Sequence, residues 1–363
     1  MQFRLDYHDA VQLKSMQRER RPMHTSIQEA LDFAIEGNDV PADVAHDAVS
    51  ALMDGECGDV EIAALLTALR TKGESVDEIF GAARAMREHA APIATQSSDL
   101  LDTCGTGGDQ LHTFNISTAT ALVAAAAGVT VAKHGNRSVS SSSGSADVLE
   151  AMGINVQLPP EAVGRCVDQI GIGFCFAPLF HGAMKYAAPI RKQLGFRTIF
   201  NLLGPLTNPA DAQFQLLGAS RTDTAEKLAH ASCRLGRKHV LVVCGDDSID
   251  EVCLWGPTQV FEVIDADVRQ MTWTAESFGL PSCTVDELKV SSAAESADVI
   301  QRVFGGEQGA RRNIVLANAA AALMAANRCS DAKSGVEIAA SAIDSGKAEE
   351  LCARLAKFSN SAS

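Results

Sequence analysis

Short apolar runs alternate with helical segments along most of this sequence, and this alternation limits the possible folds more than any other feature. Strands that alternate with helices form βαβ units, which build a mostly parallel sheet covered by helices on both faces. We therefore predict an α/β fold over most of the chain. The predicted strands are residues 100–103, 129–132, 154–158, 173–176 and 240–243, and the alanine-rich residues 117–127 are predicted as a buried helix.

The first part of the chain has a different pattern, with short helices separated by glycines. Ser26 with Glu29 and Ser75 with Glu78 match the capping box, in which a side chain and the backbone amides at a helix start satisfy each other. Apolar residues recur at helical spacing over 62–69. We predict a small domain of about four helices within residues 26–95, preceded by an extension over residues 1–25.

Composition excludes several classes of protein. The net charge of −14 would repel nucleic acid and anionic lipid over most of the surface. No apolar run is long enough to span a membrane, and the first 25 residues lack the apolar core of a signal peptide. The ten cysteines form neither Cys-x-x-Cys pairs nor zinc spacings, as expected of reduced thiols. We predict a cytoplasmic protein without nucleic acid or membrane partners.

A glycine-rich loop, Gly105-Thr-Gly-Gly-Asp109, follows the first predicted strand, and Asn115-Ile-Ser-Thr118 then opens a helix. Glycines let backbone amides approach an anion, and a helix start adds free N–H groups. Gln110 stands where the dinucleotide-binding pattern needs glycine, and no P-loop sequence is present. The loop is either another kind of phosphate site or an ordinary tight turn.

Two further loops carry the same alternatives. Lys133-His-Gly-Asn-Arg137 follows a predicted strand and supplies two cations at the carboxyl end, where open α/β sheets bind ligands. The serine-rich stretch 138–145 has the composition of a flexible linker, yet it lies between a strand and a predicted helix. Its hydroxyl and amide groups suit either an anion site or a solvated linker.

Acidic and basic groups later in the chain add candidate ligands. Asp246, Asp247, Asp250 and Glu251 follow the strand at 240–243 and suit Mg²⁺, or form a solvated acidic turn. Arg191 precedes a second basic segment that begins at residue 197. An arginine fork suits a carboxylate, although a surface salt bridge is the commoner explanation for one arginine.

The ordered set of motifs resembles the anthranilate phosphoribosyltransferase family, from about Ser26 to Lys347. The motifs are Gly105-Thr-Gly-Gly-Asp109, Asn115-Ile-Ser-Thr118, Lys133-His-Gly-Asn-Arg137, Gly144-Ser-Ala-Asp-Val-Leu149, Arg197-Thr-Ile-Phe-Asn201, Gly204-Pro-Leu-Thr-Asn-Pro209 and Asp250-Glu251. Three positions depart from the common family pattern: Ser142, where Lys is frequent, Ser248, where Gly is common, and Gly182, where Pro is usual.

The resemblance implies a small helical domain hinged to a larger α/β domain, and a homodimer. The helical domain would comprise residues 26–95 and about 181–200, and the α/β domain residues 96–180 and about 201–363. The reaction would be transfer of the phosphoribosyl group of 5-phosphoribosyl 1-pyrophosphate (PRPP) to anthranilate, giving N-(5-phosphoribosyl)anthranilate and pyrophosphate in tryptophan biosynthesis.

The resemblance also assigns roles to residues. Mg²⁺ would be held by Ser117, Asp250 and Glu251, anthranilate by Gly105, Asn136 and Arg191, with Lys133 and Arg191 as the catalytic residues. PRPP would contact Gly105, Gly108, Asp109, Thr113, Asn115, Ile116, Ser117, Thr118, Lys133, His134, Gly135, Asn136, Arg137, Ser138, Val139, Ser140, Ser141 and Ser145.

Two other functions remain open at this point. One is a pyrimidine nucleoside phosphorylase on the same fold, with phosphate as the nucleophile. The other is a catalytically silent relative that binds nucleic acid, against which the acidic net charge counts.

Overall fold

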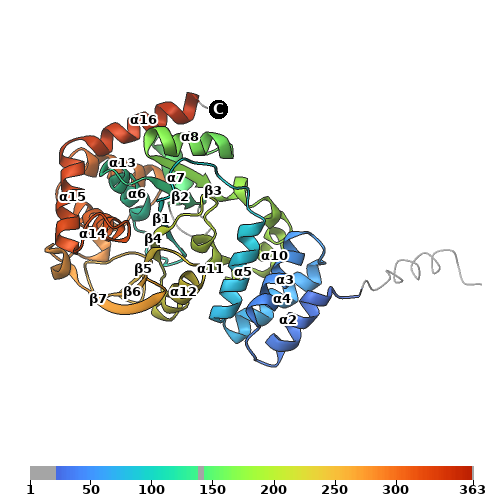
Figure 1. Cartoon of the computed structure of the whole chain (residues 1–363). Helices are drawn as coiled ribbons and strands as arrows, with labels where there is room; N and C mark the ends of the chain where they lie inside the picture. The colour runs from blue at the N-terminus through green and yellow to red at the C-terminus, as the bar shows by residue number, and fades with distance from the viewer. Residues whose placement is uncertain (1–21, 138–142, 362–363) are drawn as a thin grey trace, which may run out of the picture.

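The computed structural model describes residues 22–137 and 143–361, which form a small helical part beside a larger α/β part (Figure 1). The helical part contains α2 (Thr25–Ile35), α3 (Ala42–Met53), α4 (Asp59–Lys72) and α5 (Val76–Glu88). The predicted capping box at the start of α5 is confirmed, because Glu78 N donates to Ser75 Oγ (3.3 Å) and Ser75 N to Glu78 Oε2 (2.8 Å). The box predicted at Ser26 is wrong, because the N-cap of α2 is His24, two residues before Ser26.

A seven-stranded sheet in the order β3-β2-β1-β4-β5-β6-β7 forms the centre of the α/β part. The first five strands in that order are parallel, and β6 and β7 add an antiparallel edge, so the mostly parallel sheet is confirmed. The strands are β1 (Leu101–Gly105), β2 (Val131–Gly135), β3 (Ile172–Phe176), β4 (Phe214–Gly218), β5 (His239–Gly245), β6 (Thr258–Ile264) and β7 (Asp267–Trp273).

The strand predicted at 154–158 is wrong. Ile154, Val156 and Leu158 are buried as a strand would require, but the segment pairs with no strand. The backbone N–H of Asn155 instead donates to the Ser359 hydroxyl of the last helix (3.0 Å). A side-chain acceptor therefore satisfies part of this backbone in place of a neighbouring strand.

Helices cover both faces of the sheet. Along β5, Leu241 and Val243 belong to the apolar core shared with α6 and α14, whereas Val240 and Val242 belong to the core shared with α12. This two-residue period is the one a strand requires. The main helices of this part are α6 (Ile116–Ala126), α7 (Ser145–Ala151), α8 (Pro160–Ile170), α12 (Thr222–Arg234), α13 (Ala293–Phe304), α14 (Ala310–Ala325), α15 (Ala332–Asp344) and α16 (Lys347–Ser361).

A run of short helices joins the two parts of the molecule. It comprises α9 (Ala177–Phe180), η1 (Gly182–Lys185), α10 (Ala188–Leu194), α11 (Phe200–Leu203) and η2 (Gly204–Leu206). Ile190 and Phe200 pack in the same core as the four helices, and α10 contacts α4. This packing favours the predicted return of residues 181–200 to the helical domain, but that core continues to β5 and α12. The division into domains stays a prediction.

Asp102 on β1 is a fully buried carboxylate, and it fixes the geometry of the neighbouring strand end. It accepts hydrogen bonds from His134 N (2.9 Å) and from Asn208 Nδ2 (2.8 Å), and Asn208 Nδ2 also donates to Ala132 O (2.7 Å). Burial raises the pKa of Asp102 to about 6, although the charge of Lys133 opposes the shift. Asp102 thus links β1, β2 and the loop after η2 through one buried network.

Replacing Asp102 with Asn should destabilise the protein, because the new amide points a donor at a group that already donates. We expect Asp102→Asn to lower the free energy of unfolding in urea by about 2 kcal/mol. Asp99→Asn is the matched control, since Asp99 lies just before the same strand and pairs with Lys238 at the surface. The control should lose less than about 1 kcal/mol, and equal losses in the two variants would contradict the account.

Candidate active site

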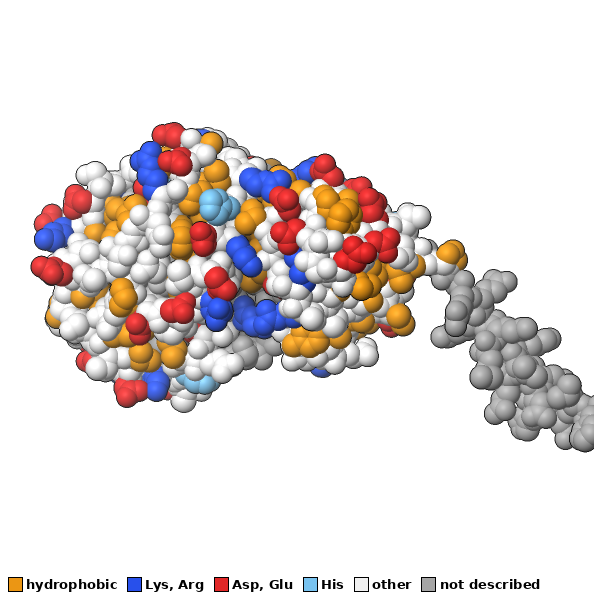
Figure 2. Space-filling model, turned by 90° about the horizontal axis from the view of Figure 1, so that it is seen from below, with side chains coloured by type: hydrophobic (Ala, Val, Ile, Leu, Met, Phe, Trp, Pro, Cys, Tyr) orange, Lys and Arg blue, Asp and Glu red, His pale blue; other side chains and the backbone are white. Residues whose placement is uncertain are grey.

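A cleft of about 650 Å³ opens at the carboxyl ends of β1, β2 and β5 and extends to the short helices that join the two parts. Figure 2 shows, on one face of the molecule, Lys and Arg side chains gathered where the helical part meets the α/β part. The acidic net charge is therefore unevenly distributed, and cations are concentrated locally as a phosphorylated ligand would require.

Most of the predicted ligand residues line this one cleft, although they come from five separate segments. They are Gly105, Gly108, Asp109, Thr113, Asn115, Ile116, Ser117, Lys133, His134, Gly135, Asn136, Arg137, Ser145, Arg191, Asp250 and Glu251. Thr118 does not line it, because its side chain is buried within α6. Ser138, Val139, Ser140 and Ser141 lie outside the described residues. The individual roles of all these residues stay predictions.

At Gly105 and Gly108, side chains from distant segments lie against the backbone of the glycine turn after β1. A Cβ on Gly105 would overlap the Asp250 carboxylate, and a Cβ on Gly108 would overlap the Arg197 guanidinium. Gly107 and Gly108 also have positive φ angles of 65° and 81°. Gly107 N donates to Asp250 Oδ2 at 2.7 Å. The turn is thereby held against the acidic pair that follows β5.

The start of α6 lies across from this turn and is capped by Asn115. The Asn115 side chain accepts from Thr118 N (2.9 Å) and donates to Ser143 O (2.8 Å). The buried Lys133 Nζ donates to Ser117 Oγ (3.2 Å) and to the Thr103 carbonyl. A helix N-terminus and an ammonium group therefore meet in the cleft, as an anion site requires.

Three carboxylates in the cleft share an environment that disfavours their charge. Burial and the charge of Asp250 raise the pKa of Asp109 to about 6, and the same two causes raise the pKa of Glu251 well above its ordinary value. Burial raises the pKa of Asp250, although Gly107 N and the positive charges of Arg197 and Lys133 oppose the shift. A cation between these groups would relieve both the desolvation and the mutual repulsion.

This donor set fits Mg²⁺ better than a metal caged by protein alone. Within residues 22–137 and 143–361, no group of three or more His, Cys, Asp or Glu side chains could hold a metal ion. Mg²⁺ is commonly bound by one or two carboxylates and completed by substrate phosphates and water. Asp250 and Glu251 match that arrangement beside the predicted anion site.

His134 and His181 form a buried pair of neutral imidazoles at the edge of the cleft. Their ring centroids lie 5.1 Å apart, and His134 Nδ1 lies 2.9 Å from Gly204 O. His134 Nε2 and both ring nitrogens of His181 have no hydrogen-bond partner among the described residues. Burial lowers the pKa of His134 to about 4 and that of His181 to about 3. His134 is therefore a weak base at neutral pH.

The histidine pair should make stability depend on pH. The unfolded chain takes up a proton at each histidine below about pH 6.5, whereas the folded chain resists protonation down to about pH 4 and 3. Stability from these groups is thus complete above pH 6.5 and is lost as the pH falls. For His181→Leu, the free energy of unfolding in urea should fall less steeply than in the wild type between pH 6.5 and 5, by about 1 kcal/mol per pH unit. Parallel profiles would contradict this assignment.

Arg191 and Arg137 occupy the cleft in different ways. Arg137 pairs with Asp147 (2.9 Å) and Glu150 (2.6 Å) at the surface. Arg191 is half-buried, and the part of the chain that the structure describes gives its guanidinium no carboxylate partner. Burial and the charge of nearby Arg197 lower its pKa. Arg191 therefore brings an uncompensated positive charge to the cleft, where a ligand carboxylate would be stabilised.

Several residues that line the cleft had no predicted role. Arg197 is the most informative, because it belongs to one of the family motifs and contacts the glycine turn from a segment about 90 residues away. Met86 comes from α5, where its apolar character is indistinguishable from that of core residues. The others include His112, Phe114, Ala177, Pro178, His181, Met184, Lys185, Phe200, Asn201 and Thr207, whereas Thr106, Gly107, Ser143 and Gly144 belong to loops predicted as candidate anion sites.

Two family models match the two parts of the chain. The helical bundle domain of a glycosyl transferase family matches residues 28–90, and the a/b domain of that family matches residues 97–349. The fold and the cleft thus define a two-part glycosyl transferase.

None of the helices over residues 22–137 and 143–361 is long and apolar enough to span a membrane.

Individual relatives narrow the family. The chain is 50% identical over 325 residues to anthranilate phosphoribosyltransferase of Symbiobacterium thermophilum, covering 90% of this chain and 95% of that protein. The crystal structure of anthranilate phosphoribosyltransferase from Thermus thermophilus is 42% identical, with a TM-score of 0.87, and the match covers 92% of this chain and 99% of that one. The Saccharomyces cerevisiae enzyme in complex with PRPP and Mg is 25% identical, with a TM-score of 0.85, over 93% and 99% of the two chains.

The chain belongs to the anthranilate phosphoribosyltransferase family. The predicted family, the predicted helical and α/β architecture, and the predicted class of enzyme are thereby confirmed.

Proposed function

We propose that this chain moves the phosphoribosyl group of PRPP onto the amine of anthranilate, releasing pyrophosphate, as a step of tryptophan biosynthesis. Membership of the family supports the reaction. One observation supports placing the reaction in this cleft: the glycine turn, the start of α6, the acidic pair and Arg191 all line it.

The donor's pyrophosphate would lie against the glycine turn and the start of α6. The N-terminal dipole of α6, together with the ammonium of Lys133, would suit the negative charge that grows on the leaving group. The bond from ribose C1 to the pyrophosphate oxygen breaks with its electron pair leaving on oxygen, while the amine lone pair forms the new C1–N bond. The amine then loses a proton to solvent, and no covalent enzyme intermediate is needed.

Asp250, Glu251 and Ser117 would hold Mg²⁺ beside this pyrophosphate. The ion neutralises charge on phosphate oxygens when it is bound. The protein places two carboxylates in the cleft, where burial raises their pKa values, and the charge of a bound Mg²⁺ would favour their ionised form.

The acceptor would lie at the other end of the cleft. Arg191 would bind the anthranilate carboxylate through its guanidinium fork, and Asn136 and Gly105 would complete the pocket. The amine would then face ribose C1, and this alignment accounts for much of the rate that such a site can supply. Packing of the short helices over the cleft would limit water.

The direct test is a fluorescence assay of anthranilate consumption with PRPP and Mg²⁺. We expect anthranilate to disappear only when both are present. Phosphate-dependent release of thymine from thymidine, with no anthranilate consumption, would instead identify a pyrimidine nucleoside phosphorylase.

Removing Arg191 should affect the acceptor far more than the donor. We expect Arg191→Ala to raise the KM for anthranilate about tenfold or more, because a charge-assisted pair with the carboxylate is lost, and to change the KM for PRPP little. Lys192→Ala is the matched control, since Lys192 is an exposed cation on the same helix that does not line the cleft. An unchanged anthranilate KM in Arg191→Ala would refute the assignment.

Neutralising the acidic pair should weaken the response to magnesium. For Asp250→Asn with Glu251→Gln, we expect the Mg²⁺ concentration that gives half-maximal activity to rise about tenfold or more, because two oxygen anions are lost from the site. Asp246→Asn removes an exposed carboxylate from the same loop and should leave the Mg²⁺ titration as in the wild type. Coincident titration curves for all three proteins would place the metal elsewhere.

The homodimer and the cytoplasmic location stay predictions. The helical part exposes apolar side chains at Ile35 (74% exposed) and Val60 (80% exposed), which favour a protein contact on α2 and α4. The expected absence of nucleic acid and membrane partners likewise rests on the acidic composition alone.

A further inference from the structure

Arg197 contacts the glycine turn although it belongs to the linking segment between α10 and α11. Its Nη2 donates to the Thr106 carbonyl at 2.9 Å. Its guanidinium also lies so close to Gly108 that a Cβ there would overlap it. Arg197 is half-buried and lines the cleft, so this contact is part of the wall against which the donor would bind.

Arg197 and Asp250 bind the two ends of the same peptide unit in the glycine turn. The Thr106 carbonyl and the Gly107 N–H belong to one peptide unit. Arg197 binds the carbonyl end of that unit, and Asp250 Oδ2 accepts the N–H end at 2.7 Å. A peptide unit that is hydrogen-bonded to charged groups at both ends is held in one orientation. This orientation in turn determines the direction of the following amide N–H groups, those of Gly108 and Asp109.

Arg197 keeps this position at an electrostatic cost. Burial and the neighbouring Arg70 lower the pKa of Arg197, whereas the carboxylates of Asp250 and Asp109 oppose the shift. No carboxylate forms a salt bridge with Arg197 within the described ranges 22–137 and 143–361. Its guanidinium instead donates to a backbone carbonyl, so the side chain serves to shape the turn.

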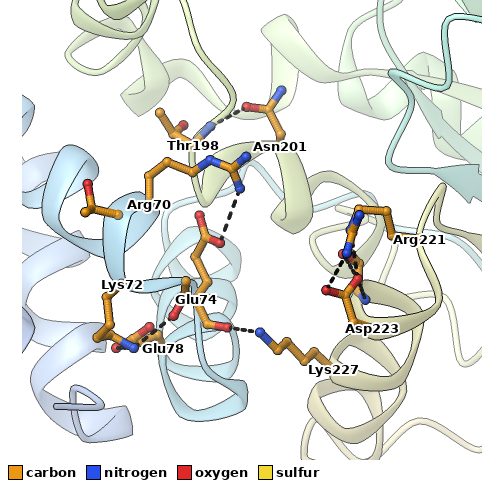
Figure 3. Close-up of polar contacts among 12 residues, drawn as sticks. Arg70, Lys72, Glu74, Glu78, Thr198, Asn201, Arg221, Asp223 and Lys227 are labelled. Atoms are coloured by element: carbon orange, nitrogen blue, oxygen red, sulfur yellow. Dashed lines mark hydrogen bonds and ion pairs between the residues drawn. The ribbon is translucent and has the colours of Figure 1, made fainter. Parts of the chain in front are cut away.

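The backbone that carries Arg197 is itself fixed between the two parts of the molecule. Thr198 N donates to Asn201 Oδ1 at 2.9 Å, and Ile199 and Phe200 pack in the core of the helical part. Figure 3 shows Arg70 reaching from α4 toward Thr198 and Asn201, with Glu74 beside it at 4.0 Å. Arg197 therefore links the helical part to the glycine turn.

We propose that Arg197 is a positioning residue for phosphoribosyl transfer, which holds the Thr106–Gly107 peptide unit together with Asp250 so that the following amides bind the donor's pyrophosphate. This inference rests on the proposed function, and it gives Arg191 and Arg197 different roles. Arg191 serves the acceptor, whereas Arg197 serves the donor through the backbone.

The test uses the full-length protein and binding of inorganic pyrophosphate without metal, measured by calorimetry, together with steady-state kinetics. For Arg197→Met, which keeps chain length but no donor, we expect the Kd for pyrophosphate to rise about tenfold. The KM for PRPP should rise as well, while the KM for anthranilate stays within about twofold of the wild type. Lys192→Met removes a neighbouring exposed cation and should match the wild type in all three quantities.

Arg197→Lys keeps the charge and one donor, so it should recover part of the pyrophosphate affinity and also serves if Arg197→Met fails to fold. Wild-type pyrophosphate affinity in either variant, or a defect confined to the anthranilate KM, would overturn the proposal. Turnover of anthranilate by the wild type tests the proposed function independently. No turnover would refute the proposed function, whereas normal turnover together with unaffected Arg197 variants would refute only the role of Arg197.

Discussion

The cleft depends on one steric constraint, the close approach of side chains from distant segments to the backbone after β1. Asp250 and Arg197 occupy the space in which a Cβ of Gly105 or Gly108 would lie. Glycine is therefore required less for flexibility than for lack of a side chain, and the turn is ordered by its neighbours. A turn that its neighbours already order would bind an anion at a smaller cost in conformational entropy.

The close packing of these segments also brings the charged groups of the cleft together. An acidic protein must concentrate its cations to hold a phosphorylated donor, and here buried Lys133 lies beside a helix start while Arg191 and Arg197 come from the linking segment. Burial raises the pKa values of Asp250 and Glu251, and the charge of Asp250 raises that of Glu251 further, in spite of the opposing charge of Lys133. This imbalance leaves room for a divalent ion, and it explains why two carboxylates suffice when substrate phosphates supply the other ligands.

The sequence predicted most of this arrangement where the signal was local. The capping box at Ser75, the buried helix α6 and the strands that precede the glycine and lysine loops all follow from short patterns. Local patterns failed at residues 154–158, because a buried segment that pairs with no strand has the same apolar pattern as a buried strand. They also failed at Ser26, because the helix begins two residues earlier than the capping motif indicates. The antiparallel edge β6–β7 had no signal apart from alternating residues, and it was not predicted.

Contacts between segments that are far apart in the chain could not be predicted from local sequence patterns. The set of residues around the donor came from the family resemblance, and Arg197 appeared only as part of a motif without a role. Its function in holding a peptide unit depends on the fold that brings residue 197 to residue 106.

The most direct measurement is a crystal structure of the protein with PRPP and Mn²⁺, in which the anomalous signal locates the metal. The account predicts a peak within about 2.5 Å of carboxylate oxygens of Asp250 and Glu251, with the pyrophosphate against the amides of Gly108 and Asp109. A metal bound away from this pair, or a pyrophosphate that does not contact the glycine turn, would contradict it.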